Sequence, residues 1–155
     1  MKLISLIKIG KVVIAVAPDH SYGRFVSDLD ICNDGSGAAF NDPHYRPATA
    51  YQNGGKFLNA GVDPYIVLPM QTRKLFKKKV MGCQAKLTNL ATDLSCDAMV
   101  GELGPTNKTG EAAYCLAKQV NPKVTHNSGD KRSLYLYEFW PGTAATVGGK
   151  TYELE

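Results

Sequence analysis

Apolar and polar residues alternate along residues 24–31, RFVSDLDI. One set of alternate positions, from Phe25 to Ile31, is mainly apolar, and the other set includes Asp28 and Asp30. Because successive side chains of a strand point to opposite faces, this pattern predicts a β-strand. It also places Asp28 and Asp30 on the same face of that strand.

Short apolar runs elsewhere predict further strands, and the intervals between them are rich in turn residues. These runs cover residues 10–18, 64–69, 80–87, 98–103 and 133–141. The segment 110–120, GEAAYCLAKQV, predicts the one main helix, with Ala112, Cys115, Leu116 and Val120 on its inner face. The stretch 41–63 has no regular pattern, and a connection of that length in a compact domain is usually functional.

The composition agrees with one β-rich domain covering residues 1–155. Hydrophobic residues make up 44% of the chain and charged residues 21%, which is typical of a globular protein. Fifteen glycines and eight prolines indicate many short elements joined by tight turns. We therefore predict a mainly β fold with one main helix, arranged as a compact six-stranded barrel. A double-psi type of barrel is an assignment by analogy.

The first 20 residues resemble a signal peptide but lack the unbroken apolar run that a signal peptide needs. Lys8, Gly10 and Lys11 interrupt the apolar region, whereas a secretory signal needs an unbroken apolar run of roughly 7 to 15 residues. We interpret this segment as two short strands. No run is long enough to span a membrane, so we expect no membrane partner. We also expect a monomeric protein.

The net charge of +4 conceals an uneven distribution of acids. Eight of the fourteen acidic residues lie within 28–42 and 93–111, and five cations gather within 73–79. If the two acidic regions meet in the fold, they form a negative cleft that attracts a cationic ligand. The basic stretch RKLFKKK has few aromatic residues for stacking on bases, so a nucleic acid is the least supported of the partners we consider.

The sequence lacks the signatures of several classes of site. The four cysteines, Cys32, Cys83, Cys96 and Cys115, form no CxxC pair, and their redox state is left open. The three histidines lie at unrelated spacings, so we expect no metal site and no cofactor. The segment DLDICNDG lacks the spacing of a calcium loop.

Two glutamates flank one tight loop in the segment AMVGELGPTNKTGEAAYCLAKQV, residues 98–120. This segment resembles the signature of the glycoside hydrolase family 75 chitosanases, in which an acid on an apolar strand is followed by a loop and a Gly-Glu pair. The segments SDLDICNDG, YRPATAYQ, DPYIVLP and YEFWPGT are similar to further family landmarks in the same order. The resemblance spans about residues 24–143. Glu102 stands where the family pattern has an aspartate.

The resemblance implies a secreted, cofactor-independent hydrolase of chitosan, a β-1,4-linked glucosamine polymer. It implies that Glu102 and Glu111 are the two carboxylates of an inverting mechanism, with Glu102 as the base and Glu111 as the proton donor. Such a mechanism needs carboxyl groups roughly 6.5 to 9.5 Å apart. Physical chemistry favours the opposite roles, because an apolar strand raises the pKa of Glu102 and a helix start stabilises an ionised Glu111.

The substrate-binding candidates lie in the strand and the long loop. Asp28 and Asp30 are candidates for binding ammonium groups or the attacking water, with a solvated strand face as the alternative. Thr49 and Tyr51 are candidates for lining the groove, with the tyrosine ring as a platform for a sugar. Asp97 is a candidate for a second acid near Glu102, with an exposed strand start as the alternative.

Three other functions remain open on the sequence. The chain fits another polysaccharide hydrolase, for instance one acting on peptidoglycan. It also fits a non-catalytic, expansin-like carbohydrate-binding module, in which case the two glutamates have structural roles only. A nucleic-acid binder that uses the basic stretch is the third alternative.

Overall fold

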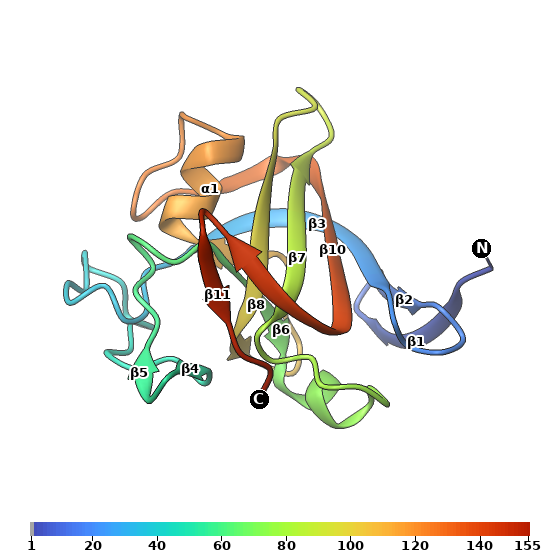
Figure 1. Cartoon of the computed structure of the whole chain (residues 1–155). Helices are drawn as coiled ribbons and strands as arrows, with labels where there is room; N and C mark the ends of the chain where they lie inside the picture. The colour runs from blue at the N-terminus through green and yellow to red at the C-terminus, as the bar shows by residue number, and fades with distance from the viewer. Residues whose placement is uncertain (1) are drawn as a thin grey trace.

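The computed structural model describes residues 2–155, which form a β-rich fold with one short α-helix (Figure 1). The strands are β1 (Ile4–Ile9), β2 (Val12–Val16), β3 (Gly23–Cys32), β4 (Gln52–Asn53), β5 (Lys56–Phe57), β6 (Tyr65–Pro69), β7 (Cys83–Asn89), β8 (Ser95–Gly104), β9 (Glu111–Ala113), β10 (Asp130–Val147) and β11 (Lys150–Tyr152). A 3₁₀ helix, η1, covers Met70–Lys74, and α1 covers Tyr114–Val120. The predicted β-rich class is confirmed.

Six strands pair in a closed ring, in the order β3, β9, β6, β8, β7, β10. The ring closes because β10 pairs antiparallel with β3 as well as with β7. The β3–β9 and β6–β8 pairs are parallel, and the other four pairs of the ring are antiparallel. The β1–β2 hairpin extends the sheet from β3, and Figure 1 shows it beside the N-terminus. The double-psi description of the ring stays a prediction.

The alternation that predicted β3 corresponds to its two faces. Phe25, Ser27 and Leu29 are buried, whereas Asp28 and Asp30 lie on the opposite, partly exposed face. Phe25 stacks on the ring of Tyr137 in β10, with ring centroids 4.7 Å apart. The β3–β10 pair therefore closes the ring with an aromatic core inside and the two aspartates outside.

The segment 110–120 differs from its prediction at its beginning. Glu111–Ala113 forms strand β9, and the helix begins only at Tyr114. β9 pairs with β3 on one edge and β6 on the other, so its backbone groups are already satisfied in the sheet. Glu111 is thus a strand residue, and the expected helix-dipole stabilisation of its carboxylate is wrong.

The long segment 41–63 is anchored to the ring by buried residues. Leu58 and Ala60 belong to the core, and the segment contains the small β4–β5 hairpin. The basic stretch 73–79 exposes its five cations and buries only Phe76, which contacts Phe139 edge-on. Within residues 2–155, no helix is both long and apolar enough to cross a membrane.

Candidate functional site

The ring aligns three acidic residues in one row across four neighbouring strands. Asp30 of β3 is in register with Glu111 of β9, Glu111 with Val67 of β6, and Val67 with Glu102 of β8. Residues in register on adjacent strands point to the same face of a sheet. With strands about 4.8 Å apart, the backbones of Glu102 and Glu111 lie about 10 Å apart across β6.

A bulge in β8 sets the position of Glu102 in this row. Val100 pairs with Ile66 and Glu102 pairs with Val67, which leaves Gly101 as an extra residue in β8. A Cβ atom at Gly101 would lie 2.3 Å from Leu58 Cδ1 and 2.8 Å from Tyr65 Cβ. Only glycine fits this position, so the bulge and the direction of the Glu102 side chain depend on Gly101.

The carboxyl group of Glu102 is buried and held by backbone donors. Its side chain is only 5% exposed, and Oε1 accepts hydrogen bonds from the backbone N–H groups of Ala50 (2.8 Å) and Leu103 (3.0 Å). Burial, together with a hydrogen bond to the Asp34 side chain, raises the pKa of Glu102 to about 8. Burial therefore favours the neutral, protonated form of this carboxyl group.

Glu111 lies in a different electrostatic environment, beside a lysine. Lys108 Nζ is 3.3 Å from Glu111 Oε1 and 2.9 Å from Asp30 Oδ2, so one cation bridges two carboxylates. Burial raises the pKa of Glu111, and the charge of Lys108 opposes that shift. The side chain of Glu111 is 17% exposed, which leaves part of it accessible.

Asp28 shares the outer face of β3 with Asp30, as the sequence predicted. Burial and the charge of Asp30 raise the pKa of Asp28. Gly110, at φ +89°, brings the backbone before β9 so close that an added Cβ would lie 2.5 Å from Asp28 Oδ1. Residues 28–30 of the first acidic region therefore lie beside residues 110–111 of the second.

Thr49 and Tyr51 lie inside the protein. Thr49 Oγ1 donates to the Tyr51 carbonyl and accepts from the Leu58 N–H. The Tyr51 ring is fully buried, and its hydroxyl donates to the Glu153 carbonyl at 2.7 Å. The prediction that Tyr51 is a sugar platform is corrected, because no ring face reaches the surface. Both residues fasten the long loop to the barrel.

Asp34 is a member of the acidic group that sequence reasoning did not select. It lies two residues after the end of β3, is 8% exposed, and its Oδ1 accepts from the Arg46 N–H at 2.8 Å. Its position just beyond the strand that carries Asp28 and Asp30 is the sequence feature that could have identified it as part of the same acidic group.

Asp97 has no part in this acidic group. It is exposed near the start of β8, opposite Lys86 of β7. Within the described residues, no group of three or more His, Cys, Asp or Glu side chains has a metal-binding arrangement, and all four cysteines are free thiols.

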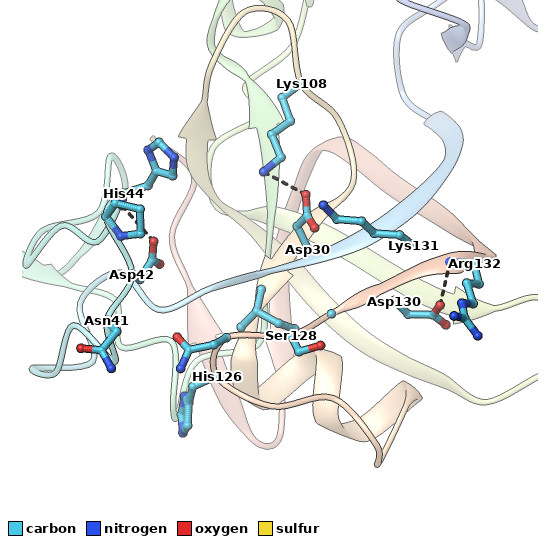
Figure 2. Close-up of a pocket in the computed structure, with 14 residues that line it drawn as sticks. Asp30, Asn41, Asp42, His44, Lys108, His126, Ser128, Asp130, Lys131 and Arg132 are labelled. Carbon is cyan, nitrogen blue, oxygen red and sulfur yellow. Dashed lines mark hydrogen bonds and ion pairs between the residues drawn. The ribbon is translucent and has the colours of Figure 1, made fainter.

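A pocket of about 870 Å³ adjoins the acidic row at Asp30 and Lys108. Figure 2 shows Lys108 reaching toward Asp30 on one side of this pocket, with His44 and Asp42 on the other side. The turn around His126 and Ser128 also lines it. Its volume is in the range of small-ligand sites. Lys108, which pairs with Glu111, lines the pocket, whereas the two glutamates do not.

No protein-family model matches the chain, and neither does any curated protein. The resemblance to the family 75 chitosanases therefore rests on the residues quoted above and stays a hypothesis. Any function proposed for the chain therefore has to be supported by the geometry of its site.

The bulge at Gly101 gives a first prediction. Replacement of Gly101 by Ala should lower the free energy of unfolding by about 1–3 kcal/mol, because the new methyl group overpacks Leu58 and Tyr65. Gly61→Ala is the control, since its Cβ would meet only Asn59 Oδ1, at 3.2 Å. Urea unfolding of both variants measures the difference, and equal stabilities would contradict the packing argument.

The protonated state of Glu102 gives a second prediction. Between pH 4.5 and about 8 the folded protein binds a proton at Glu102 that the unfolded chain releases, so stability falls as pH rises through this window. Glutamine resembles the protonated glutamate and does not titrate, so a Gln at position 102 removes this loss of stability at high pH. The Glu102→Gln variant should therefore gain stability over the parent on going from pH 5 to pH 9, by an amount on the order of a few kcal/mol.

Thermal unfolding from pH 5 to pH 9 tests this expectation, with Glu153→Gln as a control at an exposed glutamate. The shifts at Asp28 and Glu111 are present in the parent and in both variants, so they cancel in the comparison. Parallel stability curves for the parent and Glu102→Gln would show that Glu102 ionises normally.

Proposed function

We propose that this protein hydrolyses a β-1,4-linked glucosamine polymer, chitosan, by an inverting two-carboxylate mechanism. The observation that carries the proposal is the register Glu111–Val67–Glu102, which places two differently tuned carboxyl groups on one face, two strands apart. An inverting glycosidase needs carboxyl groups roughly 6.5 to 9.5 Å apart to leave room for a water molecule, and backbones about 10 Å apart are compatible with that spacing. The resemblance of residues 98–120 to the family 75 chitosanases supports the same reaction.

In this proposal Glu102 is the proton donor. Its raised pKa keeps the carboxyl group protonated at neutral pH, which is the state that a general acid requires before the leaving oxygen departs. Glu111 is the base, because the cation of Lys108 favours its ionised form. These roles reverse the assignment that the family resemblance implies, and the burial of Glu102 is the reason.

The acidic surroundings support a cationic substrate. Asp28 and Asp30 share the outer face of β3, and Asp30 also lines the pocket beside the row. A protonated amino sugar would be attracted to this concentration of carboxylates although the protein as a whole is basic. We propose Asp28 and Asp30 as contacts for substrate ammonium groups. A polymer substrate of this kind also implies that the protein acts outside the cell.

The proposal predicts which substitutions abolish hydrolysis. Glu102→Gln and Glu111→Gln should each lower kcat on chitosan by about 10²–10⁴-fold, because each removes one proton-transfer group. Asp97→Asn is the matched control, an exposed acid on the same strand as Glu102, and should keep the parent rate. A reducing-sugar assay measures all four proteins.

The same assay on peptidoglycan separates the two hydrolase hypotheses. Release of reducing ends from chitosan but not from peptidoglycan supports the proposed substrate. Turnover of peptidoglycan alone would contradict the proposed substrate while retaining a glycosidase. Lack of turnover of either polymer by the parent, with the fold intact, would favour a carbohydrate-binding module.

A further inference from the structure

One wall of the 870 Å³ pocket is a loop that begins in an unfavourable backbone conformation. This wall is the segment 41–44, and the chain enters it through Phe40 and Asn41, whose φ angles are +48° and +60°. Neither residue is a glycine, so both occupy the left-handed region at a cost. Such a conformation persists only where surrounding contacts maintain it.

A stack of three aromatic rings supplies these contacts. The imidazole of His126 stacks on the ring of Phe40, with centroids 3.7 Å and planes 4° apart, and on the ring of Tyr114, at 3.6 Å and 20°. Two rings this close to one imidazole must lie on its opposite faces, so the three rings form a sandwich. Tyr114 directly follows β9, and the sandwich therefore ties the wall 41–44 to the strand that carries Glu111.

A buried asparagine fixes the facing wall, the turn at 126–129. Asn33 is 1% exposed, and its Nδ2 donates to the His126 carbonyl at 2.8 Å. Its Oδ1 lies 3.0 Å from His126 Nδ1, which is the donor of this second bond because the Asn33 oxygen has no proton to give. Both walls are thus preformed, which lowers the ordering cost of binding a ligand between them.

Three carboxylates line the pocket, and they differ in how well they are neutralised. Asp30 is paired with Lys108 at 2.9 Å, and Asp130 accepts hydrogen bonds from a tyrosine hydroxyl and two backbone N–H groups. Asp42 accepts from the backbone N–H of His44 at 2.9 Å, and none of the four ion pairs within residues 2–155 includes it. Figure 2 shows Asp42 across the pocket from Asp30.

We propose that this pocket binds one protonated amino-sugar unit of the polymer, with Asp42 as the counter-ion of its ammonium group. This inference rests on the proposed function and adds a subsite to it. Asp30 lines the pocket and is in register with Glu111, so a sugar in the pocket lies next to the acidic row. Asn127 and Ser128 offer neutral donors and acceptors to the sugar hydroxyl groups.

The cations of the pocket do not compete with this assignment. Lys108 is already engaged by Asp30 and Glu111. Lys131 and Arg132 are exposed, so water and salt screen their charges. Asp42 is only partly exposed and has no cationic partner among residues 2–155. A cationic ligand therefore gains more in this pocket than an anionic one.

The Asp42→Asn variant tests the inference. Binding of a β-1,4-linked glucosamine trimer is measured by ¹⁵N NMR titration at mildly acidic pH, in the Glu102→Gln background so that the ligand is not cleaved. The backbone signals of 41–44 and 126–129 should shift, and Asp42→Asn should raise the Kd about 2- to 5-fold. Asp93→Asn is the matched control, an exposed aspartate outside the pocket, and should leave the Kd unchanged.

The N-acetylated trimer tests whether the charge is recognised. It should bind more weakly than the glucosamine trimer and should be insensitive to Asp42→Asn, because its acetamide groups carry no charge. Equal Kd values for Asp42→Asn and Asp93→Asn, or signal shifts confined to residues outside the pocket, would overturn the inference.

The aromatic sandwich is tested by Phe40→Ala, which should weaken binding of the glucosamine trimer because it releases the wall 41–44. Phe57→Ala is its control, since Phe57 is 52% exposed and outside the pocket lining. Equal trimer binding by the two folded variants would contradict the role of the stack. If the parent binds the trimer in this pocket but does not cleave chitosan, the proposed function fails and the subsite stands. Cleavage without binding at 41–44 would reject the subsite alone.

Discussion

Strand β6 is paired along both edges, and this double pairing determines the arrangement of the whole candidate site. It runs parallel to β8 and antiparallel to β9, and all five of its residues are buried. Val67 is the point at which both ladders meet, with Glu102 on one side and Glu111 on the other. Because side-chain direction reverses with each residue of a strand, a one-residue slip of either ladder would turn one glutamate to the opposite face.

The same row explains why the two glutamates on either side of one loop have different electrostatic environments. Glu102 lies against backbone amides and a second acid, in a site that excludes water, so its neutral form is favoured. Glu111 lies at the other side of Val67, where Lys108 stabilises the ionised form. The fold thus places two carboxyl groups with different partners on one surface, one buried against backbone amides and one paired with a lysine.

The sequence predicted those parts of the fold that depend on local pattern. The alternation in residues 24–31 identified β3 and the common face of Asp28 and Asp30, and short apolar runs identified the core strands. Glu111 was misassigned because Gly-Glu-Ala-Ala favours a helix, whereas the edges of β3 and β6 recruit residues 111–113 into the sheet. Tertiary pairing overrode local propensity there.

The contacts that were missed join residues far apart in the sequence. Tyr51 is buried and its hydroxyl donates to the backbone carbonyl of Glu153, and the Asp34 carboxyl group accepts from the N–H of Arg46. Lys108 has no motif of its own, and its role as a bridge follows from the parallel register of Asp30 and Glu111. Such pairings depend on the closure of the ring, which no local pattern encodes.

The central claim is that Glu102 and Glu111 act on opposite sides of a glycosidic bond, with a water molecule as the nucleophile. The anomeric configuration of the first products tests it most directly, by proton NMR of chitosan during hydrolysis, before the anomers equilibrate. The account predicts that the α-anomer appears first from the β-linked polymer. Initial formation of the β-anomer would contradict it, because retention requires a covalent intermediate on one of the two carboxylates.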